Sequence, residues 1–347
     1  MQFLFRRSVL ILVLVLTSCG PTAKPALSPA PPLPTSLPTP TATALLTLGN
    51  WHDMIYHEQM SQVVLVNGGP ENGKSSTAPV ELWGWAGKQW TLLSADPNGP
   101  QWRNFASVAY DSKRKALVLY GGLTAEQDFE DTWEWDGERW TQFNAVGPGP
   151  REAAGMTYDS GRERVVLFGG AQRSKAMNDT WEWDGVQWTR VSTDGPTARF
   201  PAGFAYDMAH QNVMLFGGHT FDNQGFTTYA DTWTWDGVTW QQISSEGLSP
   251  RDGARAIFIP TVSQILLFGG AEIGTSVTNL NDTWLWNGAQ WKQVDVEGPP
   301  ARVHPALAFD ESRGVVVMTG GSNGPGIILS DTWEWDGQSW ICANKCE

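Results

Sequence analysis

The chain has 347 residues, of which 41% are hydrophobic, and its formal net charge is −13. Removal of residues 1–18, which contain Arg6 and Arg7 but no acid, would take that charge from −13 to −15. This acidity argues against nucleic acid and against an anionic bilayer surface as partners. The length suffices for one large all-β domain or two smaller ones, and internal repeats favour one.

The first 18 residues have the pattern of an export signal that is removed from the mature protein. Arg6 and Arg7 form a basic start, Ser8 to Leu16 is apolar, and Leu16-Thr17-Ser18-Cys19 follows. This stretch resembles a bacterial lipobox, which implies cleavage before Cys19 and acylation of its thiol. The protein would then be anchored by its lipid to a bacterial membrane, facing outside the cytoplasm at the cell surface or in the periplasm. The alternatives are an uncleaved apolar anchor and a plain secretory leader.

A proline-rich segment follows the cysteine. Residues 20–44 contain eight prolines and one charged residue, Lys24. Such a composition cannot bury enough apolar surface to fold, so residues 19–48 are predicted to be a disordered tether. At about 3.1 Å per residue, roughly 25 residues would hold a folded domain up to about 80 Å from the membrane. Leu45 to Leu48 could instead pack on that domain as an ordered arm.

Residues 49–347 contain six copies of one pattern, at a period of 48 to 53 residues. Each copy has a Gly-Gly pair followed by three tryptophans, the second lying two residues and the third seven residues after the first. The pairs begin at Gly68, Gly121, Gly169, Gly217, Gly269 and Gly320, and the triplets at Trp83, Trp133, Trp181, Trp233, Trp284 and Trp333. A repeat of this length is typical of propellers and arrays.

The third copy shows how each repeat divides into strands. Ala153 to Tyr158 is small and apolar, Arg164 to Phe168 is β-branched and ends at Gly-Gly, and Thr180 to Trp183 alternates between two faces. Asp184-Gly185 is a hairpin signal before Trp188 opens a fourth strand. The sequence therefore predicts an all-β, six-bladed propeller with four antiparallel strands per blade. The predicted blades are about residues 49–96, 101–147, 149–195, 197–247, 249–297 and 299–347.

The tryptophans are expected to hold the blades together. Because side chains alternate along a strand, Trp181 and Trp183 share one face, and Trp188 can pack across the hairpin. An indole buries about 150 to 250 Å². The sequence therefore predicts that these rings close the propeller by stacking between neighbouring blades.

The pattern Arg151, Phe168-Gly169-Gly170, Asp179-Thr180-Trp181 and Trp188 resembles a Kelch repeat, over about residues 49 to 345. The resemblance implies a β-propeller related in fold to the central domain of galactose oxidase, with the innermost strand first in each blade. It also implies ligand binding on the face that carries the connections before strand one and between strands two and three. Tryptophan replaces the usual tyrosine of strand three, and the first blade is degenerate.

Five arginines recur 18 residues before their Gly-Gly pairs: Arg103, Arg151, Arg199, Arg251 and Arg302. The Kelch resemblance implies that arginines at this position form a basic collar around the channel mouth, where they would bind a ligand. Five aspartates open the third strands of the same blades: Asp131, Asp179, Asp231, Asp282 and Asp331. Since a guanidinium group suits both partners, the arginines could pair with these aspartates or bind an anion.

A single site must break the sixfold repeat, so unrepeated residues on the same face are better candidates for binding. Trp102, Arg255 and His304 flank first strands, and the longest connection between strands two and three contributes His219, Phe221, Asp222, Phe226 and Tyr229. Variable loops on a rigid scaffold commonly carry recognition. For each residue, the alternative is a solvated loop position or local packing.

Two cysteines, Cys342 and Cys346, lie beside the C-terminus and are predicted to form a disulfide in an exported protein. No cofactor and no metal are expected, because the five histidines show no ligand spacing. The predicted function is a non-catalytic, monomeric binding module for a protein or glycan of the cell envelope. The alternative is a carbohydrate-active enzyme resembling a sialic acid epimerase or a glycoside hydrolase.

Overall fold

The structure is a computed structural model that describes residues 46–49, 51–68, 78–173, 175–222, 225–244 and 247–346. The predicted leader, Cys19 and most of the predicted tether lie outside these residues. Within the described part of the chain, no helix has the length and apolar character needed to cross a membrane. Its helical content is one 3-10 turn, η1 (Glu58–Met60).

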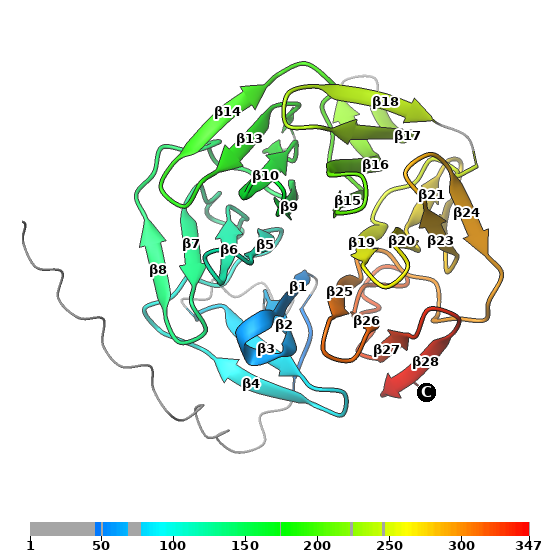
Figure 1. Ribbon diagram of the computed structural model, residues 1–347, viewed down its shortest axis with the longest axis horizontal. Coiled ribbons are helices and arrows are strands. Elements are labelled where there is room, and N and C mark those ends of the chain that lie inside the picture. The colour runs from blue at the N-terminus through cyan, green and yellow to red at the C-terminus, as the bar shows by residue number, and fades with distance from the viewer. Residues whose placement is uncertain are drawn as a thin grey trace, which may run out of the picture. The chain divides into compact units, whose positions relative to one another are not determined.

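Six four-stranded antiparallel sheets stand around a central axis as the blades of a propeller (Figure 1). Blade 1 contains β1 (His52–His57), β2 (Gln62–Asn67), β3 (Glu81–Trp85) and β4 (Trp90–Ser94). Blade 2 contains β5 (Ser107–Asp111), β6 (Ala116–Tyr120), β7 (Thr132–Trp135) and β8 (Trp140–Phe143). Blade 3 contains β9 (Gly155–Asp159), β10 (Arg164–Phe168), β13 (Thr180–Trp183) and β14 (Trp188–Ser192).

The other three blades complete the ring. Blade 4 contains β15 (Gly203–Asp207), β16 (Asn212–Asp222), β17 (Gly225–Trp235) and β18 (Trp240–Ser244). Blade 5 contains β19 (Arg255–Ile259), β20 (Gln264–Phe268), β23 (Thr283–Trp286) and β24 (Trp291–Val294), and blade 6 contains β25 (Ala306–Asp310), β26 (Val315–Thr319), β27 (Thr332–Trp335) and β28 (Trp340–Asn344). Short hairpins leave blades 3 and 5: β11 (Ala171–Gln172) with β12 (Lys175–Ala176), and β21 (Ala271–Ile273) with β22 (Val277–Asn279). The predicted six-bladed, four-stranded fold is confirmed.

The first strand of each blade is innermost, so the blade ends form two faces around a central channel. We call the face with the connections between second and third strands the mouth face, and the other the turn face. On the turn face the Asp-Gly hairpins are tight because the aspartate side chain accepts hydrogen bonds from backbone amides of the same turn. The Oδ1 atom of Asp184 accepts from the amides of Val186 and Gln187, each at 2.8 Å, and Gly185 has φ +96°.

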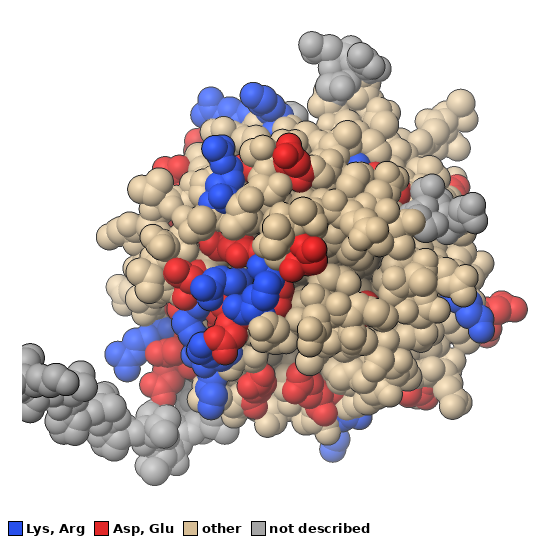
Figure 2. Space-filling model, turned by 45° about the horizontal axis from the view of Figure 1, so that its top comes forward, with Lys and Arg blue, Asp and Glu red and all other residues tan. Residues whose placement is uncertain are grey.

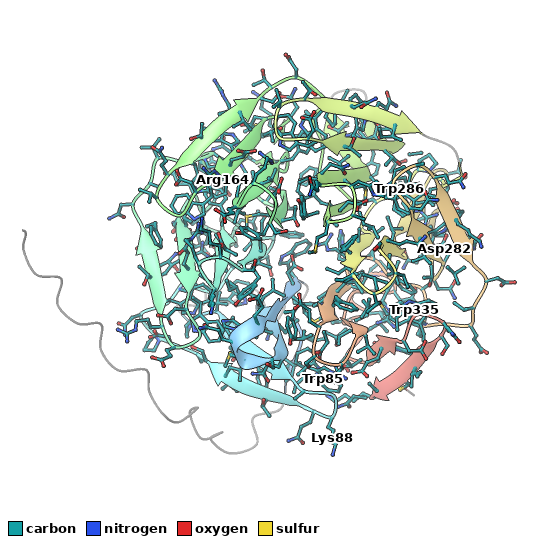
Figure 3. The ribbon with its side chains drawn as sticks, in the orientation of Figure 1. Trp85, Lys88, Arg164, Asp282, Trp286 and Trp335 are labelled. Atoms are coloured by element: carbon teal, nitrogen blue, oxygen red, sulfur yellow. A yellow bond between two sulfur atoms is a disulfide. The ribbon has the colours of Figure 1, made fainter. Side chains whose placement is uncertain are left out.

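The second and third tryptophans of each triplet lie between blades, as expected, and the first has a different place. The second is at most 2% exposed in all six blades, and Figure 3 shows Trp85, Trp286 and Trp335 inside the ring, with Lys88 at its rim. In five blades the third tryptophan packs on the second, with ring centroids 5.2 to 5.6 Å apart. Most first tryptophans are only half-buried.

Hydrogen bonds from the third tryptophan tie five of the six blades to the preceding one. Its Nε1 donates to the hydroxyl of the threonine that opens the third strand of that preceding blade. These bonds measure 2.8 to 3.0 Å and join Trp90 to Thr332, Trp188 to Thr132, Trp240 to Thr180, Trp291 to Thr232 and Trp340 to Thr283. The first of these pairs joins blade 1 to blade 6 and so helps to close the ring.

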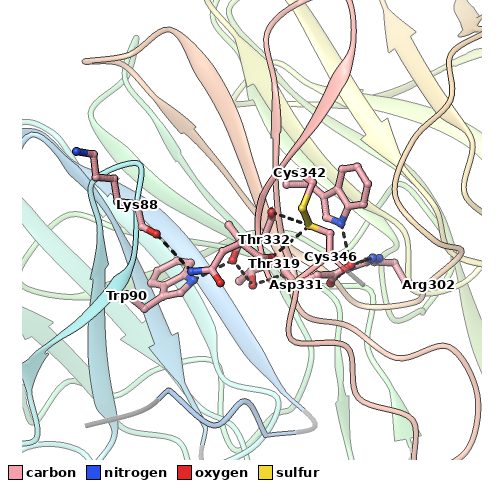
Figure 4. Close-up of a disulfide and its surroundings, with 10 residues drawn as sticks. Lys88, Trp90, Arg302, Thr319, Asp331, Thr332, Cys342 and Cys346 are labelled. Carbon is pink, nitrogen blue, oxygen red and sulfur yellow. Dashed lines mark hydrogen bonds and ion pairs between the residues drawn. A yellow bond between two sulfur atoms is a disulfide. The ribbon is translucent and has the colours of Figure 1, made fainter. Parts of the chain in front are cut away.

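Further contacts reinforce that closure between blades 1 and 6. His52 from blade 1 reaches the Gly-Gly pair of blade 6, where its Nε2 accepts from the amide of Gly321 at 3.2 Å. Cys342 and Cys346 form the predicted disulfide, with Cα atoms 5.9 Å apart (Figure 4). The Asn344 side chain, between these cysteines, donates to the carbonyl oxygen of Lys88 in blade 1.

Blades 1 and 2 lack the tryptophan–threonine hydrogen bond that joins the other neighbouring blades. Leu82 stands where the other blades have threonine, and the Nε1 of Trp140 has no hydrogen-bond partner among the described residues. The Nε1 of Trp135 and both ring nitrogens of His57 are likewise buried without a described partner. Blade 1 is joined to blade 2 by other polar contacts, among them the bond from Nε1 of Trp51 to the carbonyl oxygen of Ala106 at 3.2 Å.

Candidate functional site

The five repeated arginines are buried and paired with the five repeated aspartates. Each guanidinium group binds the aspartate that opens the third strand of its own blade, with side-chain exposure of 2% or less for the arginine. The pairs are Arg103 with Asp131, Arg151 with Asp179, Arg199 with Asp231, Arg251 with Asp282, and Arg302 with Asp331. The sequence left two alternatives, pairing with the aspartates and binding of an anion, and the structure shows the pairing.

These pairs also organise the rest of the repeat. In blade 5, Arg251 donates to the carbonyl oxygen of Gly269 at 3.1 Å, and the indole of Trp284 donates to Asp282 at 2.7 Å. The same bonds recur in blades 2, 3, 4 and 6. Gly-Gly is needed because a Cβ on Gly269, which has φ +67°, would lie 2.7 Å from the carbonyl oxygen of Arg302 in the next blade. Arginine, aspartate, tryptophan and glycine thus form one structural unit.

None of the five arginines lines the large central cavity, so the collar predicted around the mouth is not part of that cavity wall. The reason is that each side chain turns toward the third strand of its own blade. Anion binding by these arginines stays a prediction, and their burial and pairing argue against it. Figure 2 likewise shows most basic side chains beside acidic ones on the face that it displays.

The central cavity has a volume of about 540 Å³ and extends along the first strands of the blades. Toward the turn face it is lined by one aromatic residue per blade: Tyr56, Tyr110, Tyr158, Tyr206, Phe258 and Phe309. Toward the mouth face its wall breaks the sixfold repeat. There the lining includes Trp51, Asp53, Phe105, Phe200, His219, Asp252, Arg255 and His304.

Arg255 is the cationic side chain in this part of the cavity. It begins β19, and its guanidinium carbon lies 4.7 Å from the ring centroid of Trp51. No carboxylate of the described residues lies within ion-pair distance of it, unlike the five repeated arginines; its one described hydrogen bond, at 3.5 Å, goes to the carbonyl oxygen of Ala254. Burial lowers the pKa of Arg255, and the nearby charges of Asp53 and Asp252 act in the opposite direction. A guanidinium group remains charged in proteins, so Arg255 presents to the cavity a cation that has carboxylates nearby but no direct ion pair among the described residues.

His219 and Asp252 form a second polar group at the mouth. The Nδ1 atom of His219 is 2.7 Å from Oδ1 of Asp252. The imidazole is stacked between Phe200 and Phe226, with both ring centroids 4.6 Å away. Blade 4 provides this arrangement because β16 and β17, with 11 residues each, continue past the Gly-Gly pair as a long hairpin.

Electrostatic effects at the mouth follow from burial and from these neighbours. Burial acts to raise the pKa of Asp252, but the hydrogen bond with His219 and the proximity of His304 outweigh it and hold that pKa below its usual value. Burial raises the pKa of Asp53, although Arg255 opposes the shift. Burial also lowers the pKa of His304 to about 4, so its imidazole is neutral near pH 7.

The structure brings together three of the predicted unrepeated residues: Arg255, His304 and His219. Phe226 joins them by stacking on His219 and is 41% exposed, whereas Phe221 at the hairpin tip is 57% exposed. Tyr229 packs under the repeated Arg199, whose guanidinium carbon is 3.8 Å from its ring, and Trp102 is buried away from the central cavity. The side chain of Asp222 lies outside the described residues.

Sequence reasoning missed Trp51, Asp53, Phe105, Phe200 and Asp252 as site residues. The sequence could have indicated two of them, because their residue types differ from those at the same positions of the other five blades. Trp51 stands where the other blades have a small residue or proline: Ala106, Ala154, Ala202, Ala254 and Pro305. Asp53 stands where they have an apolar residue: Val108, Met156, Phe204, Ala256 and Leu307.

The site contains no evident metal centre in the described part of the chain, where no three histidine, cysteine, aspartate or glutamate side chains are grouped suitably. What the mouth offers is a cation without a direct ion pair, the carboxylates of Asp53 and Asp252, the second of which is bound to an imidazole, and aromatic rings around them. Such a set can bind and orient a partly apolar molecule that carries a negative charge.

A comparison with curated proteins found no match. The sequence model of the KLHDC2/KLHL20/DRC7 Kelch-repeats domain matches residues 52–250, which is more than half of the chain and extends from the start of blade 1 to just beyond blade 4. Together with six four-stranded blades and the recurring arginine, Gly-Gly and tryptophan unit, this match shows that the chain belongs to the Kelch-repeat family described by that domain.

Proposed function

We propose that this protein is a non-catalytic binding module that recognises a protein or a glycan at the mouth of its channel. Kelch propellers commonly serve as protein-interaction modules. We further propose that lipidated Cys19 and the proline-rich tether display the propeller outside the cytoplasm of a bacterium. The arrangement would place a rigid recognition surface at a distance from the membrane while leaving the blades free of membrane contact.

The observation that carries this proposal is the unpaired guanidinium group of Arg255. A buried charge is costly unless it is paired, and five other arginines of this chain satisfy that rule within their own blades. Arg255 is only half-buried and lies over Trp51 in a cavity of about 540 Å³, without such a pair. An anionic group of the ligand would supply its missing partner.

A test of mouth recognition uses the full chain with Arg255→Met, and Arg164→Met as the matched control. Arg164 begins β10 on the turn face and is labelled in Figure 3. Binding would be measured by calorimetry against acidic peptides and against envelope oligosaccharides. We expect Arg255→Met to weaken binding at least tenfold and Arg164→Met to leave it unchanged. Equal binding by both variants would refute recognition at the mouth.

Anchoring is tested separately with Cys19→Ser. In cells fed a labelled fatty acid, the wild-type chain should carry the label and sediment with membranes, because acylation of the thiol supplies the anchor. The Cys19→Ser chain should carry no label. Incorporation of label into that variant, or a wild-type chain without label, would contradict the proposal.

A carbohydrate-active enzyme is the second candidate, favoured by the hydrogen bond between His219 and Asp252 beside Arg255. A histidine oriented by a carboxylate can transfer protons. Turnover of any sugar by the wild-type chain, lost in Asp252→Asn, would favour this candidate over simple binding.

A further inference from the structure

The central cavity also opens on the turn face, where its wall differs in chemistry from the mouth. The first strands of the blades surround the axis (Figure 1), and the aromatic residue that each contributes to this end is next to last in its strand. The residue that follows the strand lines the cavity as well, in every blade: Glu58, Ser112, Ser160, Met208, Pro260 and Glu311. Met208 is 52% exposed, so the cavity reaches solvent here. We call these aromatic residues and the residues that follow them the turn-face entrance.

The aromatic rings of the turn-face entrance lie around the channel. The hydroxyl of Tyr206 accepts a hydrogen bond of 3.2 Å from the amide of Gly161 in blade 3, so this side chain extends toward the neighbouring blade. Tyr56, Tyr110 and Tyr158 are half-buried and line the cavity, so part of each ring borders it. The face of an aromatic ring carries negative potential and attracts cations. This wall therefore favours a positively charged group.

The charged residues of the turn-face entrance are both acidic. Glu58 belongs to η1 of blade 1 and Glu311 to blade 6, and both are exposed. Their two loops touch, because the hydroxyl of Ser312 donates to the carbonyl oxygen of Ser61 at 3.4 Å. Ion pairs of the described residues on this face use the aspartates that end first strands, and none includes Glu58 or Glu311. Burial, and then the charge of Glu58, raises the pKa of Glu311.

The two ends of the channel thus differ in charge. Arg255 is the one lysine or arginine among the described residues that line the cavity, and it lies at the mouth, with Asp53 and Asp252 nearby. It precedes Phe258 by three residues of β19, a separation of about 10 Å along an extended strand. The mouth therefore holds charges of both signs, whereas the turn-face entrance holds negative charge beside aromatic rings.

We propose that the turn-face entrance binds a small organic cation that carries an alkylated ammonium group, of which choline is the simplest probe. A primary ammonium group has three N–H donors to satisfy. The hydroxyl of Tyr206 is already bound to a backbone amide, and Phe258 and Phe309 have no polar side-chain atom. An alkylated ammonium group needs contact with ring faces and a nearby negative charge, and both are present here. This site is separate from the proposed recognition at the mouth.

The test titrates the full chain with choline by calorimetry at low ionic strength, since salt screens exposed carboxylates. The double variant Glu58→Gln with Glu311→Gln removes both charges with little change in size. Glu272→Gln is the matched control, because Glu272 is exposed on β21 at the mouth face. Tyr158→Leu removes one ring. The unfolding midpoint of each variant is measured alongside, and the exposed glutamates keep the test valid if Tyr158→Leu does not fold.

We expect choline to bind the wild-type chain at one site. Its affinity should fall at least about tenfold in the double glutamine variant and remain within about twofold in Glu272→Gln. Tyr158→Leu should lower it about 3- to 30-fold, the range expected for one cation–π contact. The uncharged isostere of choline, with carbon in place of nitrogen, should bind much more weakly.

Vesicles of phosphatidylcholine identify the source of the ammonium group. Flotation of the chain with these vesicles, reversed by free choline, would assign the site to a lipid headgroup. Binding of choline without flotation would assign it to a free small molecule.

Several results would overturn this assignment. Absence of saturable choline binding would do so, as would equal affinity of the wild-type chain and the double glutamine variant. Equally tight binding of the uncharged isostere would show an apolar site instead. Stronger choline binding in Arg255→Met, with no change in the double glutamine variant, would place the cation beside the carboxylates of the mouth. None of these results bears on recognition at the mouth, which the comparison of Arg255→Met with Arg164→Met tests separately.

Discussion

At the scale of single residues, Arg251 and Arg255 lie four positions apart in the sequence but have different surroundings and different roles. Arg251 is 1% exposed and bound to Asp282, a glycine carbonyl and Ser249, whereas Arg255 has no carboxylate partner among the described residues. The repeated residue stabilises the blade, and the unrepeated one is available to a ligand. Spacing to the Gly-Gly pair distinguishes the two in the sequence, but the direction of each side chain is set by tertiary packing.

Three histidines with lowered pKa values make the stability of the protein depend on pH. Burial lowers the pKa values of His52, His57 and His304 to about 4, compared with about 6.5 in an unfolded chain. The unfolded state therefore takes up protons at higher pH than the folded state does. The stabilisation from keeping these rings neutral is complete above about pH 6.5 and is lost as the pH falls toward 4.

We accordingly expect the unfolding midpoint to decrease between pH 6.5 and 4.5, with uptake of up to three protons on unfolding. Asp53 and Glu311, whose pKa values are raised chiefly by burial, bind protons in the folded state and reduce the net uptake. Calorimetric unfolding in buffers of different ionisation enthalpy measures the proton uptake. A midpoint that stays constant over this range would contradict the burial of these rings.

At the scale of elements, the three tryptophans of each triplet lie on two strands and have three different roles. The first indole binds the aspartate of the arginine pair, the second fills the space between blades, and the third donates to a threonine of the preceding blade. The alternation of strand residues predicted that the first two share a face. It did not predict their different burial, because the two rings lie at different points of the same strand and meet different neighbours.

Blade 1 lacks the threonine that accepts the hydrogen bond of the third tryptophan, and this difference allows the role of that bond to be tested. Trp140 and Trp188 are equivalent and are 7% and 5% exposed, but only Trp188 has a described partner, the hydroxyl of Thr132. Replacement by phenylalanine removes similar volume from both sites. Because only Trp188→Phe also breaks a hydrogen bond and leaves a hydroxyl unpaired, it should lower the free energy of unfolding by about 1 kcal/mol more than Trp140→Phe does.

Denaturant unfolding of the two variants measures this difference. Equal losses in Trp140→Phe and Trp188→Phe would show that the bond to Thr132 contributes nothing. A greater loss in Trp140→Phe would reverse the assignment of the weaker blade contact. Thr232→Val, which removes the partner of Trp291, provides an independent control and should be destabilising.

At the scale of the whole molecule, sequence reasoning was sufficient for the architecture and incomplete for the site. The repeat predicted the number of blades and their strands, and two cysteines close together in an exported protein predicted the disulfide near the C-terminus. Arg255, His219 and His304 were identified as candidates because they break the repeat. Asp252 and Phe200 were missed because the residue type at their position in the repeat differs among the blades. Only the structure shows that both contact His219.

The ring is also less symmetric than six similar repeats imply. Blades 6 and 1, which the chain ends join, share the Trp90–Thr332 bond, the His52 contact and the Asn344–Lys88 bond. The contact between blades 1 and 2, within the continuous chain, lacks the equivalent tryptophan bond. Closure thus relies on side chains across the join, since every blade takes its four strands from one contiguous segment.

The most direct test of the account compares the unfolding free energies of Arg251→Met and Arg255→Met. Arg251→Met leaves Asp282 without its buried partner and should cost about 3 to 5 kcal/mol. Arg255→Met removes an unpaired charge from a partly buried position and should leave stability within about 1 kcal/mol of wild type, or raise it. A large loss in Arg255→Met with little change in Arg251→Met would contradict the assignment of repeated residues to the scaffold and unrepeated ones to the site.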